Sequence, residues 1–271
     1  MVHLLAIEWL KIKSYRAFWW ILGITAMSYV GISFSSLFAY QQLLNNPQLT
    51  ADGAKMIFGN PFSFDEVWHT LAYVSSLLVT IPALMIIMLI TNEYSFRTHR
   101  QNIIDGWSRK QFITAKLLDV LSVTILVTAM YTAISLFVGS LDTETSSELS
   151  NAKTGFIGYF FLQTFSQLSI AFSLGMIFRK SFIALGVFIF WSVIFEPLLT
   201  KILATDTFSL GHYLPFEISD RMIPPPAFLS KVDPLAYQSM MDSTNSFLIY
   251  TLLFTVLLWI GCFQINAKRD L

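Results

Sequence analysis

The sequence predicts an all-α polytopic membrane protein with six transmembrane helices and with both termini on the cytoplasmic side. Of its 271 residues, 55% are hydrophobic and only 13% are charged. One soluble core of this length could not cover so much apolar surface. Long segments without a charged residue recur along the chain, and basic residues gather in alternate connecting segments. These three observations predict helices that cross a bilayer.

Six segments are apolar enough to span, because a helix needs about 20 residues to cross the hydrocarbon core. The spans are expected at about 17–40, 67–91, 115–139, 155–178, 181–200 and 245–266. The fifth is the shortest and reaches the boundary only by including Glu196 and Pro197. Pro82 predicts a bend in the second span, since proline removes a helical hydrogen bond. Residues 1–271 are interpreted as one membrane domain.

The orientation follows from the basic residues, which divide 12 to 5 between the two sets of connecting segments. Basic loops resist translocation, so the richer set is expected on the cytoplasmic side of a plasma (inner) membrane. This set comprises Lys11, Lys13, Arg16, Arg97, Arg100, Arg109, Lys110, Lys116, Arg179, Lys180, Lys268 and Arg269. The whole chain carries 17 basic and 17 acidic residues, which gives no indication of nucleic-acid binding.

Residues 1–16 are expected to form an interfacial helix on the inner leaflet. Val2, Leu5, Trp9 and Ile12 fall on one helical stripe, with Lys11 opposite. Such a helix could contact the lipid and a partner protein. The alternative is a solvated beginning of the first span.

Residues 92–114 are expected to form a helical hairpin. Ser108 and Gln111 have the spacing of a capping box, which predicts a helix beginning after Ser108, and Asp105-Gly106 predicts a turn just before it. Residues 92–104 would then extend the second span before the turn. The hairpin would offer Phe96, Arg100, Ile103 and Ile104 to another protein, unless it is only a loop facing lipid headgroups.

The same segment resembles the cytoplasmic loop of type 2 ABC exporter permeases. In that family a Glu precedes a Gly-Thr-x-Arg element, followed by Ser-Arg and a Lys. Here the sequence has Glu93, Arg97-Thr98, Ser108-Arg109 and Lys116. It departs from the pattern at Arg97, which stands where the family commonly has Gly, and at Gly106-Trp107, where a Pro often precedes Ser-Arg.

The resemblance implies the permease subunit of an ATP-driven export system, paired with a copy of itself or with another permease. A separate ABC ATPase would couple to it through the N-terminal helix and through the hairpin. The residues expected to couple are Glu93, Phe96, Arg97, Thr98, Arg100, Ile103, Ile104, Ser108 and Arg109. The sequence has no Gly-x-x-x-x-Gly-Lys-Ser/Thr motif, so the partner, and not this chain, is expected to bind ATP and Mg²⁺. His3, His99 and His212 are scattered too widely to suggest a metal site, and no catalytic site or cofactor is expected in this chain.

Residues 201–244 are expected to form an extracellular segment, because they connect the fifth and sixth spans on the side with fewer basic residues. They contain several prolines but also many apolar and aromatic residues, so they are not expected to be disordered. The resemblance implies short outer helices here that form an extracellular gate beginning at Glu196 and Pro197. An inert surface cap is the alternative. Trp68 and His69 are expected in the outer aromatic belt of the second span.

Two other functions remain open from the sequence alone. The chain could be a structural or signalling membrane subunit, or a transporter that works without an ATPase. An intramembrane enzyme would need paired catalytic groups inside the spans, and the charge-free segments contain none apart from Glu196. The transported substrate is not predicted.

Overall fold

The computed structural model describes residues 2–45, 59–141, 153–205, 208–226 and 234–268, and these are almost wholly helical. Five helical segments in this part of the chain are long and apolar enough to cross a membrane. They are α2 (Arg16–Leu44), α7 (Arg109–Gly139), α8 (Gly155–Phe178), the segment Ser181–Leu203 and α13 (Pro234–Lys268). The bounds of α8 coincide with the predicted fourth span.

A bent pair of helices occupies the place of the predicted second span. α4 (Val67–Ser76) and α5 (Thr80–Ser95) meet at 49°, and together they are long and apolar enough for one further crossing. Pro82 lies in the first turn of α5. Its missing N–H and its ring are incompatible with a regular bond to the carbonyl of Leu78. The predicted bend is therefore confirmed.

The predicted fifth span is one helical segment of three parts. α9 (Ser181–Ile189) leads into a π-helix, η1 (Phe190–Phe195), and then into α10 (Glu196–Leu203). Pro197 leaves one carbonyl of the preceding turn without its usual donor, and the wider π turn accommodates this disruption. The segment extends to Leu203, beyond the predicted end at residue 200.

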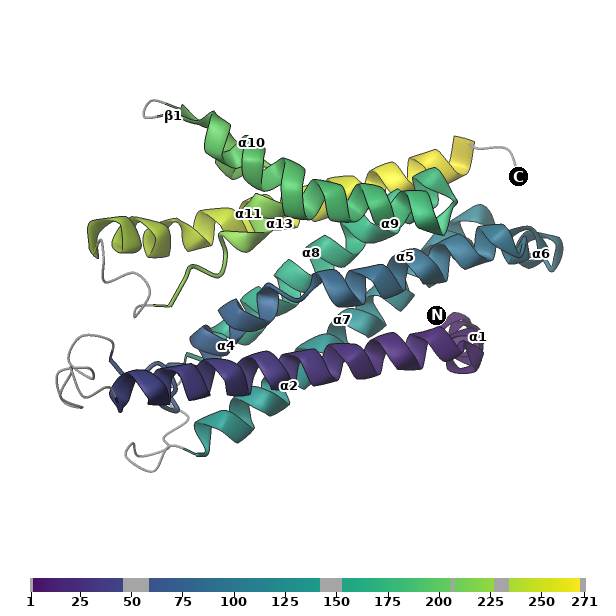
Figure 1. Ribbon diagram of the computed structural model, residues 1–271. Coiled ribbons are helices and arrows are strands. Elements are labelled where there is room, and N and C mark those ends of the chain that lie inside the picture. The colour runs from purple at the N-terminus through teal and green to yellow at the C-terminus, as the bar shows by residue number, and fades with distance from the viewer. Residues whose placement is uncertain (1, 46–58, 142–152, 206–207, 227–233, 269–271) are drawn as a thin grey trace.

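The two ends of the bundle carry different structures (Figure 1). One end, here the α6 end, holds α1 (Val2–Ser14), α6 (Thr98–Ile104), the beginning of α7 and the end of α13. The other, the α11 end, holds α4, the paired strands β1 (Ala204–Thr205) and β2 (Phe208–Ser209), the 3₁₀ turn η2 (Leu210–Tyr213) and α11 (Pro215–Asp220). α13 begins at Pro234, within the segment 201–244 that was predicted to be extracellular.

α8 forms the centre of the bundle and packs against α4, α5, α7, α9, α11 and α13. Gly175 allows the closest approach, because a Cβ there would collide with the side chain of Ile90 on α5. Trp259 of α13 stacks on Phe172 with ring centroids 5.0 Å apart, and its indole N–H donates to Ser169 Oγ at 2.9 Å. Aromatic packing and one buried hydrogen bond thus join α13 to α8.

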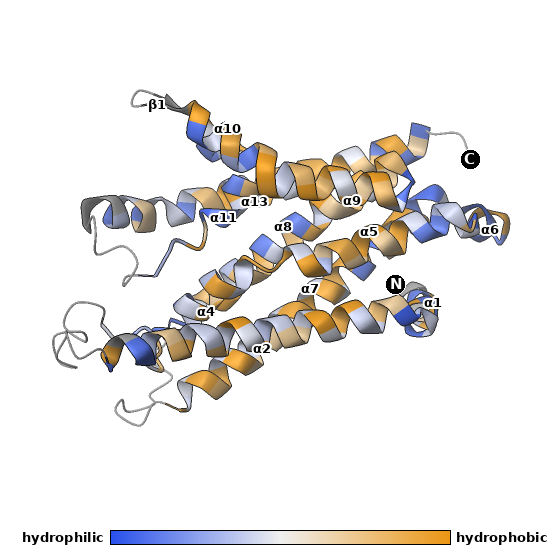
Figure 2. Ribbon diagram, viewed as in Figure 1, coloured by the Kyte–Doolittle hydropathy of each residue, from blue (hydrophilic) through white to orange (hydrophobic). Residues whose placement is uncertain are grey.

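Large apolar side chains also cover the outward faces of the long helices. Phe182 is 88% exposed and Met27 is 78% exposed. Figure 2 shows hydrophobic residues along the middle of the long helices and hydrophilic residues around α6. A surface of this kind is stable in lipid and would aggregate in water.

Candidate functional site

The hairpin between α5 and α7 contains two sharp turns. α5 ends at Ser95, and Arg97 adopts a left-handed conformation (φ 55°) before α6 begins at Thr98. The predicted continuous extension of the second span through residues 92–104 is therefore wrong. Its physical cause is the left-handed turn at Arg97, which interrupts the helix before α6.

The second turn leads into α7 as the sequence predicted. Gly106 has φ 99°, and Ser108 then caps α7. The Ser108 hydroxyl accepts from the Gln111 backbone N–H at 3.2 Å, and Gln111 Oε1 accepts from the Ser108 N–H at 2.8 Å. This reciprocal pair confirms the predicted capping box and fixes where α7 begins.

A buried group of charges lies behind the hairpin, at the α6 end. Lys116 Nζ, on α7, lies 2.6 Å from Glu93 Oε1 and 3.1 Å from Asp119 Oδ2, and it also pairs with Glu8 Oε2 on α1. All four side chains are buried. These residues and Lys11 are called the ion cluster below.

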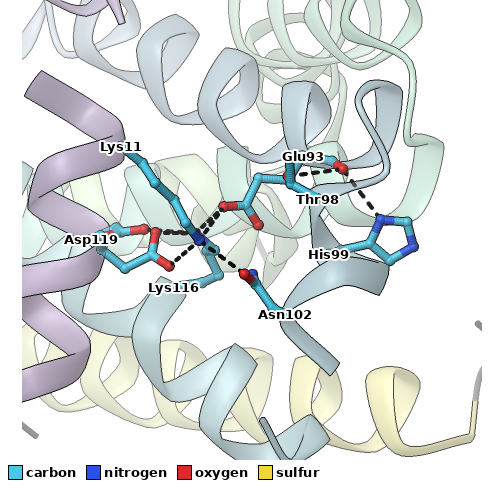
Figure 3. Close-up of polar contacts among 8 residues, drawn as sticks. Lys11, Glu93, Thr98, His99, Asn102, Lys116 and Asp119 are labelled. Atoms are coloured by element: carbon cyan, nitrogen blue, oxygen red, sulfur yellow. Dashed lines mark hydrogen bonds and ion pairs between the residues drawn. The ribbon is translucent and has the colours of Figure 1, made fainter. Parts of the chain in front are cut away.

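Lys11 extends the ion cluster from α1 to α6 (Figure 3). Its ammonium lies 2.8 Å from Glu8 Oε1 and 3.5 Å from both Glu93 Oε1 and Asn102 Oδ1. It also lies 5.5 Å from the centre of the Trp107 ring, at cation–π distance. α1 is thereby joined to both legs of the hairpin.

The charges of the ion cluster depend on one another. Burial alone would raise the pKa of Glu8, but Lys116 and Lys11 outweigh it and hold that pKa below its ordinary value. Three carboxylates share two ammonium groups, so removing either lysine would leave buried negative charge without compensation. Such a loss is far more destabilising than the loss of an exposed ion pair.

This cluster was not predicted from the sequence. Lys116 was assigned to a cytoplasmic loop, and Lys11 to the solvent side of the N-terminal helix. The available signal was the spacing of Glu8 and Lys11 and of Lys116 and Asp119, each three residues apart on one helix. The pairing between helices has no local signal.

The predicted coupling residues separate into two groups. Phe96 and Ile104 are 75% and 77% exposed. Arg97, Thr98 and Arg100 are also exposed, and Ile103 is half-buried. These six residues are called the hairpin face below.

The other three predicted coupling residues make contacts within the chain. Glu93 belongs to the ion cluster, and Ser108 caps α7. The Arg109 guanidinium donates through Nη1 to the Ala267 carbonyl at 2.7 Å, and the Arg109 carbonyl accepts from Asn266 Nδ2 at 3.0 Å. Arg109 therefore ties the beginning of α7 to the end of α13.

At the α11 end, Glu196 holds the predicted gate segment in place. Its Oε1 accepts from the backbone N–H groups of Phe216 and Glu217, at 2.6 and 2.8 Å. Its Oε2 accepts from the Trp191 indole at 2.6 Å. One buried carboxylate thus joins the beginning of α10 to the beginning of α11, whose N-terminus favours negative charge. Pro197 follows it as the second residue of α10.

Three other helices also hold residues 215–224. Gln163 and Gln167 of α8 each donate to Asp220 Oδ1 at 2.7 Å. His69 Nε2 of α4 lies 2.7 Å from the Pro224 carbonyl, and Thr251 of α13 donates to the Ile218 carbonyl at 3.3 Å. Trp68 and His69 are both buried, so their expected place in an aromatic belt is wrong. His69 stacks on Phe156 of α8, and Trp68 meets Phe64 edge to face.

The described part of the chain contains no group of three or more His, Cys, Asp or Glu side chains arranged to hold a metal ion. Pro225 and Pro226 continue away from the fixed segment toward residues 227–233, which lie outside the described residues.

Its long apolar helices and lipid-facing surface make this chain a helical, multi-pass membrane protein. Residues 54–271 match the family described as "Protein of unknown function (DUF2705)", and the chain belongs to that family. The matched region contains the hairpin and the α11 segment, whereas α1 and α2 precede it. No curated protein matches the sequence.

Proposed function

We propose that this chain is the membrane-spanning permease subunit of an ATP-driven export system, and that a separate ATPase docks on the hairpin face. The observation that carries the proposal is the position of this face. Phe96, Ile104 and Arg100 are exposed on a short helical hairpin whose two legs are joined by the ion cluster to each other and to α1. Because these elements are joined, a displacement that a docked partner imposes on this surface would be transmitted to α1 and α7.

In the proposed topology, α2, the bent pair α4–α5, α7, α8, α9–α10 and α13 form six spans, with the α6 end in the cytoplasm of a plasma membrane. The exposed charges support this orientation. Exposed basic residues gather at the α6 end, namely Lys13, Arg16, Arg97, Arg100, Lys110, Arg179, Lys180 and Lys268. Of the described acids at the same end, Glu8, Glu93 and Asp119 are buried in the ion cluster, and Asp105 is exposed.

The proposed mechanism transmits motion through rigid contacts. A partner that closes on nucleotide would displace α6, and the ion cluster would carry that displacement to α1 and α7. Arg109 would pass it to α13, while the bend between α4 and α5 would let the two halves of that span move differently. Coupled rigid-body shifts of packed helices are a common form of gating.

At the opposite end, α11 is the proposed outer gate. Its backbone is fixed by Glu196 and by side chains of α4, α8 and α13. Movement of any of these helices would strain the hydrogen bonds that hold it. Motion begun at the hairpin could therefore open a path through a dimer of this chain, or through its pair with another permease.

The test is purification of the tagged full-length chain in mild detergent. The proposal expects an ATPase subunit to co-purify in roughly equal amount and to hydrolyse ATP. Arg100→Glu should weaken this association, because it replaces one of the two cations of the hairpin face with an anion and so cancels the positive charge of that face. Lys201→Glu is the matched control, since Lys201 is exposed on α10, far along the chain from the hairpin.

Recovery of the chain without any ATPase would contradict the proposal and favour a structural subunit or an independent transporter. An Arg100→Glu variant that retains its ATPase and its stimulated hydrolysis would refute the hairpin face as the docking surface, even if the ATPase itself co-purifies.

A further inference from the structure

The N-terminal helix α1 buries a charged residue and exposes large apolar ones. Glu8 and Ile12 are buried, whereas Trp9 is 50% exposed and Leu10 is 65% exposed. A helix on a water-facing surface would have the opposite arrangement. The outward side of α1 is therefore suited to the polar–apolar boundary of a membrane, where tryptophan is enriched.

The junction of α1 and α2 places cations among these aromatic rings. α1 ends at Ser14 and α2 begins at Arg16, so the chain changes direction around Tyr15. The Trp19 indole donates to the Lys13 carbonyl at 3.1 Å. The Trp9 and Trp19 rings meet edge to face, with centroids 6.4 Å apart. Lys13 and Arg16 are both exposed. Trp9, Lys13, Arg16 and Trp19 are called the elbow below.

An apolar groove adjoins the elbow. It has a volume of about 90 Å³ and lies between α1, the beginning of α2 and α7. Its lining residues are Trp9, Ile12, Phe18, Asp119, Ser122, Val123 and Leu126. Asp119 pairs with Lys116 in the ion cluster, and Glu8 is buried there as well. The acids near the elbow are thus neutralised internally, while its cations face outward.

We propose that the elbow binds the headgroup of an anionic phospholipid. Lys13 and Arg16 face the phosphate, Trp9 and Trp19 lie at the level of the ester groups, and the groove receives the beginning of an acyl chain. Clustered basic residues beside interfacial aromatic rings attract anionic lipids in this way. This site does not depend on an ATPase partner, so it can exist whether or not the proposed function is correct.

Native mass spectrometry of the full chain tests the site. The delipidated protein is offered equal amounts of phosphatidylglycerol and phosphatidylcholine with the same acyl chains. The proposal expects preferential retention of phosphatidylglycerol by the natural chain. The double variant Lys13→Gln with Arg16→Gln should weaken the binding of phosphatidylglycerol by about fivefold for each cation removed. The binding of phosphatidylcholine should be unchanged.

Two control variants test whether the effect depends on the positive charges of the elbow. Lys201→Gln removes an exposed cation from α10 and should retain the preference. Lys13→Arg with Arg16→Lys keeps both charges at the elbow and should also retain it. Unchanged unfolding of the double Gln variant in phosphatidylcholine nanodiscs would show that it is folded.

Five results would overturn the proposal. The natural chain could hold both lipids equally, or the double Gln variant could keep its preference. Lys201→Gln could lose the preference as strongly, which would show only a general charge effect. Inorganic phosphate could displace the lipid at equal concentration, which would indicate a site for free anions. Finally, the double Gln variant could lose a protein partner while its lipid binding is unchanged, which would assign the elbow to that protein instead.

Discussion

Lys116 Nζ lies 2.6 Å from Glu93 Oε1, although 23 residues separate the two in the chain. This contact closes the base of the α5–α6–α7 hairpin inside the bundle. Because Glu8 reaches the same ammonium from α1, the hairpin and the N-terminal helix share one set of charges. The stability of this end therefore depends on residues that face no solvent.

Replacing Lys116 with Met should lower the free energy of unfolding by about 3–5 kcal/mol, the range for breaking one partner of a buried ion pair. In this variant Lys11 is the one remaining cation of the ion cluster, beside the carboxyl groups of Glu8, Glu93 and Asp119. Chemical unfolding in detergent measures the loss. Lys110→Met is the control, because Lys110 is exposed on the same helix and its loss should cost under about 0.5 kcal/mol. Equal effects of the two variants would contradict the buried cluster.

The contribution of Glu8 should depend on pH. Its folded pKa is lowered, since Lys116 and Lys11 outweigh the effect of burial. As the pH falls, the unfolded chain therefore takes up the Glu8 proton first, near its ordinary pKa of about 4.3. The contribution is complete above that pH and is lost as the pH falls through the folded pKa.

Glu8→Gln should thus be less stable than the natural chain by about 2 kcal/mol at pH 7, the value of a hydrogen bond to a charged group. The difference should shrink toward zero as the pH falls below about 4. Unfolding curves of both proteins across this range test the sign. A difference that grows in acid would contradict the assignment.

Arg97→Gly should be more stable than Arg97→Ala by about 1 kcal/mol, because alanine keeps the cost of the left-handed conformation and glycine does not. Both variants lack the guanidinium, so their comparison isolates the backbone. Thermal unfolding of the two, side by side, measures the difference. An Arg97→Ala variant as stable as Arg97→Gly would show that residue 97 is not left-handed.

Glu196→Ala should release the beginning of α11. The amides of Phe216 and Glu217 each lose a charged acceptor, and their hydrogen exchange should accelerate roughly tenfold or more. Exchange followed by mass spectrometry resolves this segment. Lys201→Ala, an exposed position on the same helix α10, should leave the rate unchanged. An unchanged rate in Glu196→Ala would mean that Glu196 does not hold α11.

Features set by nearby residues were predictable from the sequence. Ser108 and Gln111 form the expected capping box, and the bend before Pro82 follows from a missing N–H. The bounds of α8 follow from the charge-free segment between Lys153 and Arg179. Each depends on groups within a few residues of one another.

Features set by distant residues were not predictable. The stripe of residues 1–16 suggested that Trp9 and Ile12 share an environment, yet Ile12 is buried and Trp9 is exposed. The side chains of Val2 and Leu5, in the same stripe, lie outside the described residues. Glu8 of α1 faces inward to pair with Lys116, 108 residues away in the chain. The helical periodicity of residues 1–16 contains no information about that partner.

Contacts between residues far apart in the sequence also explain the roles of Glu93 and Glu196. Glu93 was expected at a coupling surface from its place in the loop motif, and Glu196 at an outer gate as an ionisable residue at the edge of a span. In the structure each carboxylate accepts from groups on other elements of the chain. A sequence identifies a charge at the edge of a span, whereas tertiary packing decides whether that charge meets solvent, a partner or the protein itself.

The order of the ion cluster along the chain has a consequence for biosynthesis. The ribosome completes Glu8 and Glu93 before it reaches Lys116, and Asp119 follows three residues later. Both carboxylates from other helices therefore already exist when the lysine enters α7. An unpaired ammonium in apolar surroundings is costly, and this order makes neutralisation available to Lys116 as soon as it is synthesised.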